Sequence, residues 1–151
     1  MNATEWNERS GPGANAKREL PRMMSDYFVQ VRSAMRATPK PADLHKIRLA
    51  SKKVRYTLEL FRPCYGPGLD ERLKALKDVQ TSLGDVNDAV AASELVGDTM
   101  PRSARRKALR AYLKQRAAEK AEEFRVHWME TFDAEGQERW WLEFLRKPRL
   151  K

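Results

Sequence analysis

Apolar residues recur along most of the chain at the three- and four-residue spacing of amphipathic α-helices. The first such pattern predicts a helix from Pro21 to about Ala37, because proline is tolerated in the first turn of a helix. Residues 1–19 contain a serine–glycine–proline–glycine break and little apolar content. They are expected to form a flexible arm, which leaves residues 20–151 as the helical domain.

Two further helical patterns follow, separated by a turn rich in proline and glycine. One begins near Ala42 and ends at the turn formed by residues 62–68. The next runs over residues 70–83, with leucine or valine at helical spacing. Gly84 is expected to end this helix, and Asp85 to act as the N-cap of a fourth helix.

The last third of the chain predicts one long helix and a short apolar segment. After a break at residues 97–101, the long helix is expected from about Ser103 to Thr131. A glycine-containing break then precedes a C-terminal segment rich in tryptophan and phenylalanine. Strand patterns are almost absent, and short connections of this kind usually join antiparallel neighbours. The predicted fold class is therefore all-α, an antiparallel helical bundle of four to five helices.

Within the second predicted helix, basic residues fall in one narrow stripe. With about 3.6 residues per turn, successive residues lie about 100° apart, so residues three and four apart share a face. One arc of about 80° contains His45, Arg48, Lys52, Arg55 and Glu59. We term these five residues the basic stripe. Like charges on successive turns repel each other, and an anionic polymer lying along the stripe would remove that repulsion.

The ordinary alternative is a basic helix face that meets only solvent. No acidic residue interrupts the run between Lys46 and Arg55. Arginine and lysine on successive turns match the spacing of phosphate oxygens along an extended chain, so we favour anion binding. His45 alone is weaker support, since a lone histidine is more often structural than a metal ligand. We predict no metal site.

Composition restricts the class of partner. The 151 residues have a formal net charge of +9, so nucleic acid, a phosphate polymer or a membrane surface is the expected partner. Charged residues make up 34% and hydrophobic residues 41%, which suits amphipathic helices rather than general disorder. With Cys64 as the one cysteine, no intramolecular disulfide is possible. The chain has neither a membrane-spanning apolar run nor a secretory signal, so we expect a cytoplasmic protein without membrane association.

Other chemical signatures are weak or missing. Lys74 and Lys77 lie one turn apart on the third predicted helix and would extend the basic surface if that helix packs beside the stripe. A second positive run on the long helix is scattered around its axis and is interpreted as a general electrostatic field. This run comprises Arg102, Arg105, Arg106, Lys107, Arg110, Lys114 and Arg116. Glycine-rich phosphate loops and metal or nucleophile motifs are absent, so we predict neither an enzyme nor a cofactor.

Two segments, in this order and at this separation, resemble a known family. The first is residues 44–59, which begin Leu-His-Lys-Ile-Arg and end Lys-Lys-Val-Arg-Tyr-Thr-Leu-Glu. The second is residues 76–88, Leu-Lys-Asp-Val-Gln-Thr-Ser-Leu-Gly-Asp-Val-Asn-Asp. Together they resemble the CHAD domain, the conserved histidine α-helical domain. The resemblance is strong over residues 42 to about 96 and elsewhere rests on helical pattern.

The resemblance implies a fold, a ligand and a set of site residues. It implies two four-helix bundles related by pseudo-two-fold symmetry, whose HxxR-type basic helices line a channel or groove. The implied ligand is inorganic polyphosphate, and the implied location is the polyphosphate granule. The implied binding residues are His45, Arg48, Lys52, Lys53, Arg55 and Lys77, to which helical spacing adds Lys74. Supporting roles, in orienting basic groups or joining helices, are implied for Tyr56, Glu59, Gln80, Asn87 and Asp88.

The chain contains one HxxR-type helix, whereas a complete domain of the family has two. Both segments are more similar to the C-terminal half of that domain, so the chain resembles half a domain. A homodimer would place two basic helices across one channel. Trp140, Trp141 and Phe144 would suit such an interface, although packing within one chain explains them equally well. The alternatives are a truncated half-domain, a nucleic-acid-binding helical protein, and a helical scaffold whose charge is incidental.

Overall fold

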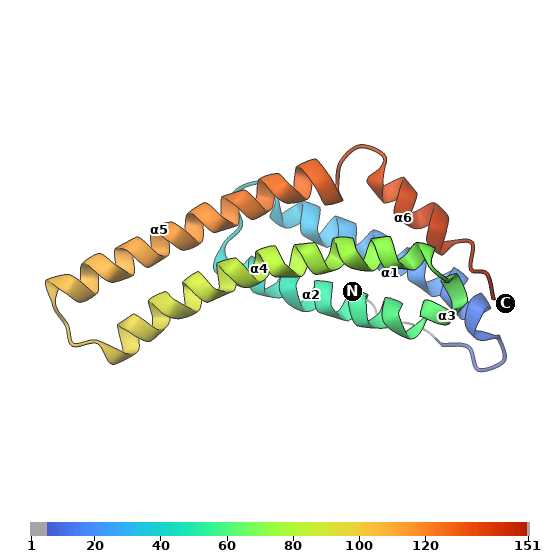
Figure 1. The fold of residues 1–151 in the computed structure, drawn as a ribbon, viewed down its shortest axis with the longest axis horizontal. Coiled ribbons are helices and arrows are strands. Elements are labelled where there is room, and N and C mark those ends of the chain that lie inside the picture. The colour runs from blue at the N-terminus through green and yellow to red at the C-terminus, as the bar shows by residue number, and fades with distance from the viewer. Residues whose placement is uncertain (1–5, 151) are drawn as a thin grey trace.

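The computed structural model describes residues 6–150, and every regular element within that range is helical (Figure 1). The long helices are α1 (Pro12–Ala34), α2 (Pro41–Leu60), α4 (Gly68–Thr99) and α5 (Ala104–His127). The short elements are α3 (Arg62–Tyr65), the π-helical turn η1 (Trp128–Phe132) and α6 (Gln137–Leu145). The predicted all-α fold class is confirmed.

The four long helices pack as neighbours in chain order (Figure 1). Helices α4 and α5 form a hairpin whose far end projects beyond α1 and α2, and α6 folds back against α1. The apolar faces of α1, α2 and α4 enclose one continuous core with the C-terminal part of α5, η1 and α6. The structure is therefore the helical bundle that the sequence predicts.

Helix α1 begins at Pro12, so the flexible arm predicted for residues 1–19 is wrong from that residue onward. Proline suits the first turn of a helix, and Ala16 in the next turn is fully buried. Pro21, which was expected in the first turn, lies inside the helix. Burial of the apolar residues around it outweighs the hydrogen bond that proline cannot donate. The part of the prediction that concerns residues 1–5 lies outside the described residues.

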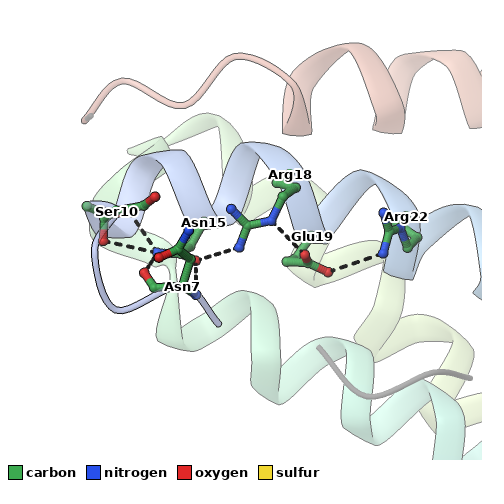
Figure 2. A network of polar contacts seen from close by, with 7 residues as sticks. Asn7, Ser10, Asn15, Arg18, Glu19 and Arg22 are labelled. Atoms are coloured by element: carbon green, nitrogen blue, oxygen red, sulfur yellow. Dashed lines mark hydrogen bonds and ion pairs between the residues drawn. The ribbon is translucent and has the colours of Figure 1, made fainter. Parts of the chain in front are cut away.

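Buried Asn15 ties the segment before α1 to the helix (Figure 2). Its side-chain oxygen accepts a hydrogen bond from the backbone N–H of Asn7 (2.8 Å), and its amide donates to the carbonyl oxygens of Asn7 (3.0 Å) and Gly11 (3.0 Å). Arg18 donates to the same Asn15 oxygen (2.8 Å) and forms an ion pair with buried Glu19 (2.8 Å). These bonds satisfy polar groups at the start of α1, which is why the helix begins this early.

Helix α4 is continuous through Gly84, so the predicted helix end there and the predicted N-cap at Asp85 are both wrong. Leu83 and Val86 are buried on either side of the glycine, and the helical spacing of the apolar face is unbroken. Packing of that face outweighs the roughly 1 kcal/mol by which an interior glycine weakens a helix relative to alanine.

The aromatic residues near the C-terminus pack inside the chain. Trp128 and Trp141 are almost fully buried, and Phe132 lies between them, with ring centroids 4.4 Å and 5.5 Å away. Trp140 and Phe144 are partly buried against the same core. Of the two explanations that the sequence left open for these residues, packing within one chain is the one the structure supports.

Candidate functional site

The basic stripe lies on the outer side of α2, along its boundary with α4. Helix α2 begins at Pro41, and its apolar face is buried, which turns the stripe toward solvent. His45 is exposed, whereas Arg48, Lys52 and Arg55 are partly buried. The charged ends of these side chains are therefore accessible while their stems lie against the bundle.

Arg55 connects the stripe to α4. Its Nη1 donates a hydrogen bond of 2.6 Å to Oε1 of Gln80. Its Nε lies 3.4 Å from Oε1 of Glu59, one turn along α2, and its guanidinium carbon lies 5.0 Å from the centre of the Tyr56 ring. Three of the residues with implied supporting roles therefore contact one cation of the stripe.

At the other end of the stripe, His45 and Arg48 share a small hollow with Asn87 of α4. The hollow has a volume of about 30 Å³, and Leu83 contributes to its apolar lining. Asp88, the next residue on α4, is exposed. The structure thus places the neutral amide of Asn87, rather than a carboxylate, in the hollow with the two stripe residues.

The three remaining predicted lysines are exposed. Lys77 lies one turn before Gln80 on α4, so it adjoins the stripe across the helix boundary. Lys74 lies a further turn back, and Lys53 is on the side of α2 away from α4. By helical position, Lys77 is the nearest of these three lysines to the contact between Arg55 and Gln80.

Most basic side chains of this surface form no ion pair within residues 6–150. In the described range, Arg55 has the one ion pair of the stripe, and His45, Arg48 and Lys52 have none. The same holds there for Lys53, Lys74 and Lys77. The surface therefore carries positive charge that an external anion can neutralise.

The second positive run has a structural role that its charge pattern did not predict. Arg106 donates from Nη2 to the carbonyl oxygen of Gly97, near the end of α4 (2.6 Å). Arg110 packs over the same glycine, where an added β-carbon would lie 2.9 Å from the guanidinium carbon. These two arginines therefore link the start of α5 to the end of α4. A glycine within a helical pattern is the sequence signal that points to such a close contact.

Within residues 6–150, no three histidine, cysteine, aspartate or glutamate side chains are grouped as a metal site requires. No helix in that range has both the length and the apolar character needed to cross a bilayer.

The family model of the CHAD domain matches residues 2–97, more than half of the chain. The chain therefore belongs to the CHAD domain family. The match takes in α1, α2, α3 and nearly all of α4, so it includes the basic stripe and the α4 residues beside it. CHAD domains are associated with polyphosphate binding. No curated protein and no solved structure matches the chain.

Proposed function

We propose that this protein binds inorganic polyphosphate and does not act on it chemically. The observation that carries the proposal is a row of basic side chains on one helix, of which His45, Arg48 and Lys52 form no ion pair within the described residues. A linear polyanion can contact these groups in succession and remove their mutual repulsion. The association of CHAD domains with polyphosphate favours this polymer over other polyanions.

Binding would rest on several charge-assisted hydrogen bonds that act together. Arg48 and Arg55 present planar guanidinium groups that suit pairs of phosphate oxygens, and Lys52 supplies a mobile ammonium between them. The outer contacts of the proposed site are Lys53, Lys74 and Lys77. Because each contact is weak, affinity should rise with polymer length and fall as salt is added.

We further propose a homodimer that places two basic stripes across one channel. The CHAD resemblance implies two HxxR-type helices in a complete domain, and this sequence contains one. Beside the stripe, the outer face of α2 carries Leu49 (54% exposed), Tyr56 (51%) and Leu60 (81%) in one row. An exposed apolar row of this kind suits a protein–protein contact. In cells that store polyphosphate, the dimer would be a cytoplasmic protein attached to the granules.

A direct titration tests the choice of ligand. The protein is titrated at physiological salt with long-chain polyphosphate and, separately, with single- and double-stranded nucleic acid. Polyphosphate should bind more tightly than either nucleic acid. Equal or tighter binding of nucleic acid would contradict the proposal and favour the nucleic-acid alternative, and binding of neither polymer would favour a helical scaffold.

A double substitution tests the position of the site. Arg48→Ala with Lys52→Ala should weaken polyphosphate binding about a hundredfold or more, because each charge-assisted hydrogen bond contributes about 1.5–3 kcal/mol. Arg102→Ala with Arg105→Ala removes the same charge from exposed positions on the hairpin and is the matched control. An equal loss in the control would show that the general positive field, rather than the stripe, binds the polymer.

A further inference from the structure

Helix α4 contains one glycine that its neighbours do not explain. A β-carbon added at Gly68 would lie 2.7 Å from Cε2 of Phe144, and one added at Gly97 would lie 2.9 Å from Cζ of Arg110. A β-carbon added at Gly84 would meet no atom within 4 Å. Because glycine weakens a helix interior relative to alanine, packing among the described residues gives no reason for glycine at this position.

Gly84 lies halfway along the boundary between α2 and α4. At one point of that boundary, Arg55 is hydrogen-bonded to Gln80. At a second point, Arg48 of α2 and Asn87 of α4 line the same small hollow. Arg48 precedes Arg55 by seven residues, and Asn87 follows Gln80 by seven residues. These two pairs define an antiparallel register between α2 and α4. Gly84 lies about one helical turn from Gln80 and one turn from Asn87.

The same register places a lysine across from the glycine. Lys52 lies about one helical turn from Arg48 and one turn from Arg55 on α2. It is therefore at the level of Gly84, in the middle of the boundary. Lys77 lies two turns before Gly84 on the same face of α4. Neither lysine forms an ion pair within residues 6–150, so both can meet an anion along this part of the boundary.

We propose that Gly84 is a contact position for the polymer, at which the missing side chain lets a polyphosphate chain lie deep between α2 and α4. This inference rests on the proposed function and adds to it the path of the ligand. The charge of the flanking lysines favours an anionic chain over a helix of a second copy as the occupant. Phosphate oxygens seated over Gly84 would be within reach of Lys52, and a side chain at position 84 would hold them away from it.

The proposal predicts opposite changes in stability and in binding for one substitution. Gly84→Ala should raise Tm, because alanine favours the helix and its methyl group enters open space. The same change should weaken polyphosphate binding, and Gly84→Leu should weaken it about tenfold or more, as expected when one charge-assisted hydrogen bond is lost. A residue with only a structural role would not separate the two quantities in this way.

The experiment measures Tm, oligomeric state and affinity for long-chain polyphosphate in the full chain and in both Gly84 variants. Ala108→Leu, which adds a large side chain at an exposed position of α5, is the control and should bind as the unaltered protein does. Raised Tm with weakened binding would support the proposal. Unchanged binding in both Gly84 variants would overturn it while leaving the proposed function intact.

Two other results would also overturn the inference. If Gly84→Leu changes the oligomeric state and leaves affinity for polyphosphate unchanged, the space above Gly84 belongs to a second copy of the chain. If the unaltered protein does not bind polyphosphate, the proposed function fails and this inference fails with it.

Discussion

At Arg55, a stripe cation is oriented by neighbours that leave most of its charge available. Gln80 is neutral, so its hydrogen bond of 2.6 Å holds the guanidinium without cancelling the charge. Glu59 lies farther away, with 3.4 Å between its Oε1 and the Nε of Arg55. Of the five N–H donors of an arginine side chain, Gln80 takes one. This arrangement is compatible with the proposed contact between Arg55 and a phosphate group.

Replacing Gln80 with glutamate tests whether Arg55 contacts the polymer. Gln80→Glu would put a carboxylate in hydrogen-bond contact with Arg55, and that carboxylate would compete with phosphate for the same donors. We expect an unchanged or higher Tm and about tenfold weaker polyphosphate binding, measured by titration. Gln115→Glu makes the same change of charge at an exposed position on α5 and should have little effect. Equal polyphosphate affinities of the two variants would contradict a contact between Arg55 and the polymer.

Among the elements, α6 is held on α4 by a buried arginine. The guanidinium carbon of Arg72 lies 3.7 Å from the centre of the Trp140 ring and 3.8 Å from that of Phe144. The group donates to the carbonyl oxygens of Gly68 (3.0 Å) and Trp140 (2.8 Å). Burial lowers the pKa of Arg72 to about 10, and nearby Glu71 opposes that shift. Arg72 is therefore charged in both the folded and the unfolded chain at neutral pH, where its contribution to stability does not vary with pH.

Removal of this arginine should loosen α6. Arg72→Ala deletes two ring contacts, removes two side-chain hydrogen bonds to carbonyl oxygens and opens a cavity, so we expect a loss of about 2–4 kcal/mol in the free energy of unfolding. Thermal denaturation followed by circular dichroism should show a Tm lower by roughly 5–10 °C. Arg139→Ala, at an exposed arginine of α6 itself, is the control and should leave Tm unchanged. Similar Tm values for the two variants would contradict this role of Arg72.

For the molecule as a whole, the net charge of +9 does not by itself locate a site. Both α2 and the first half of α5 carry basic runs. On α5, Arg106 and Arg110 are committed to Gly97 and the hairpin. On α2, the cations lie beside neutral polar groups of α4 and next to an exposed apolar row. The proposed channel involves the whole molecule, because a second copy of the chain must face the stripe.

Light scattering at several protein concentrations tests the dimer. The unaltered protein should have the mass of a dimer, and Leu49→Ser with Leu60→Ser should shift it toward monomer, because these substitutions remove exposed apolar area from α2 without changing the charge. Leu95→Ser with Tyr112→Ser alters exposed apolar residues of the hairpin instead and should leave the mass unchanged. A protein that is monomeric at every concentration and still binds polyphosphate would contradict the two-stripe channel.

Much of the fold and the position of the stripe could be predicted because both depend on local spacing. The helical class, the break at residues 62–68 and the alignment of His45 with Arg48 follow from residues close together in the chain. The start of α1 at Pro12 could not be predicted in the same way, since it depends on burial of Ala16 against the core. Local sequence likewise predicts a break at Gly84, where packing against distant segments keeps α4 intact.

By itself, the sequence determined that the chain is helical, that α2 presents a row of cations, and that the chain is similar to CHAD domains. These features are set by residue type and by the geometry of a single helix. Tertiary structure alone decided that Arg55 meets Gln80, that Arg72 lies between two rings of α6, and that Gly84 faces open space. Each of these depends on which surface of one helix covers another, a choice made by packing between segments far apart in the chain.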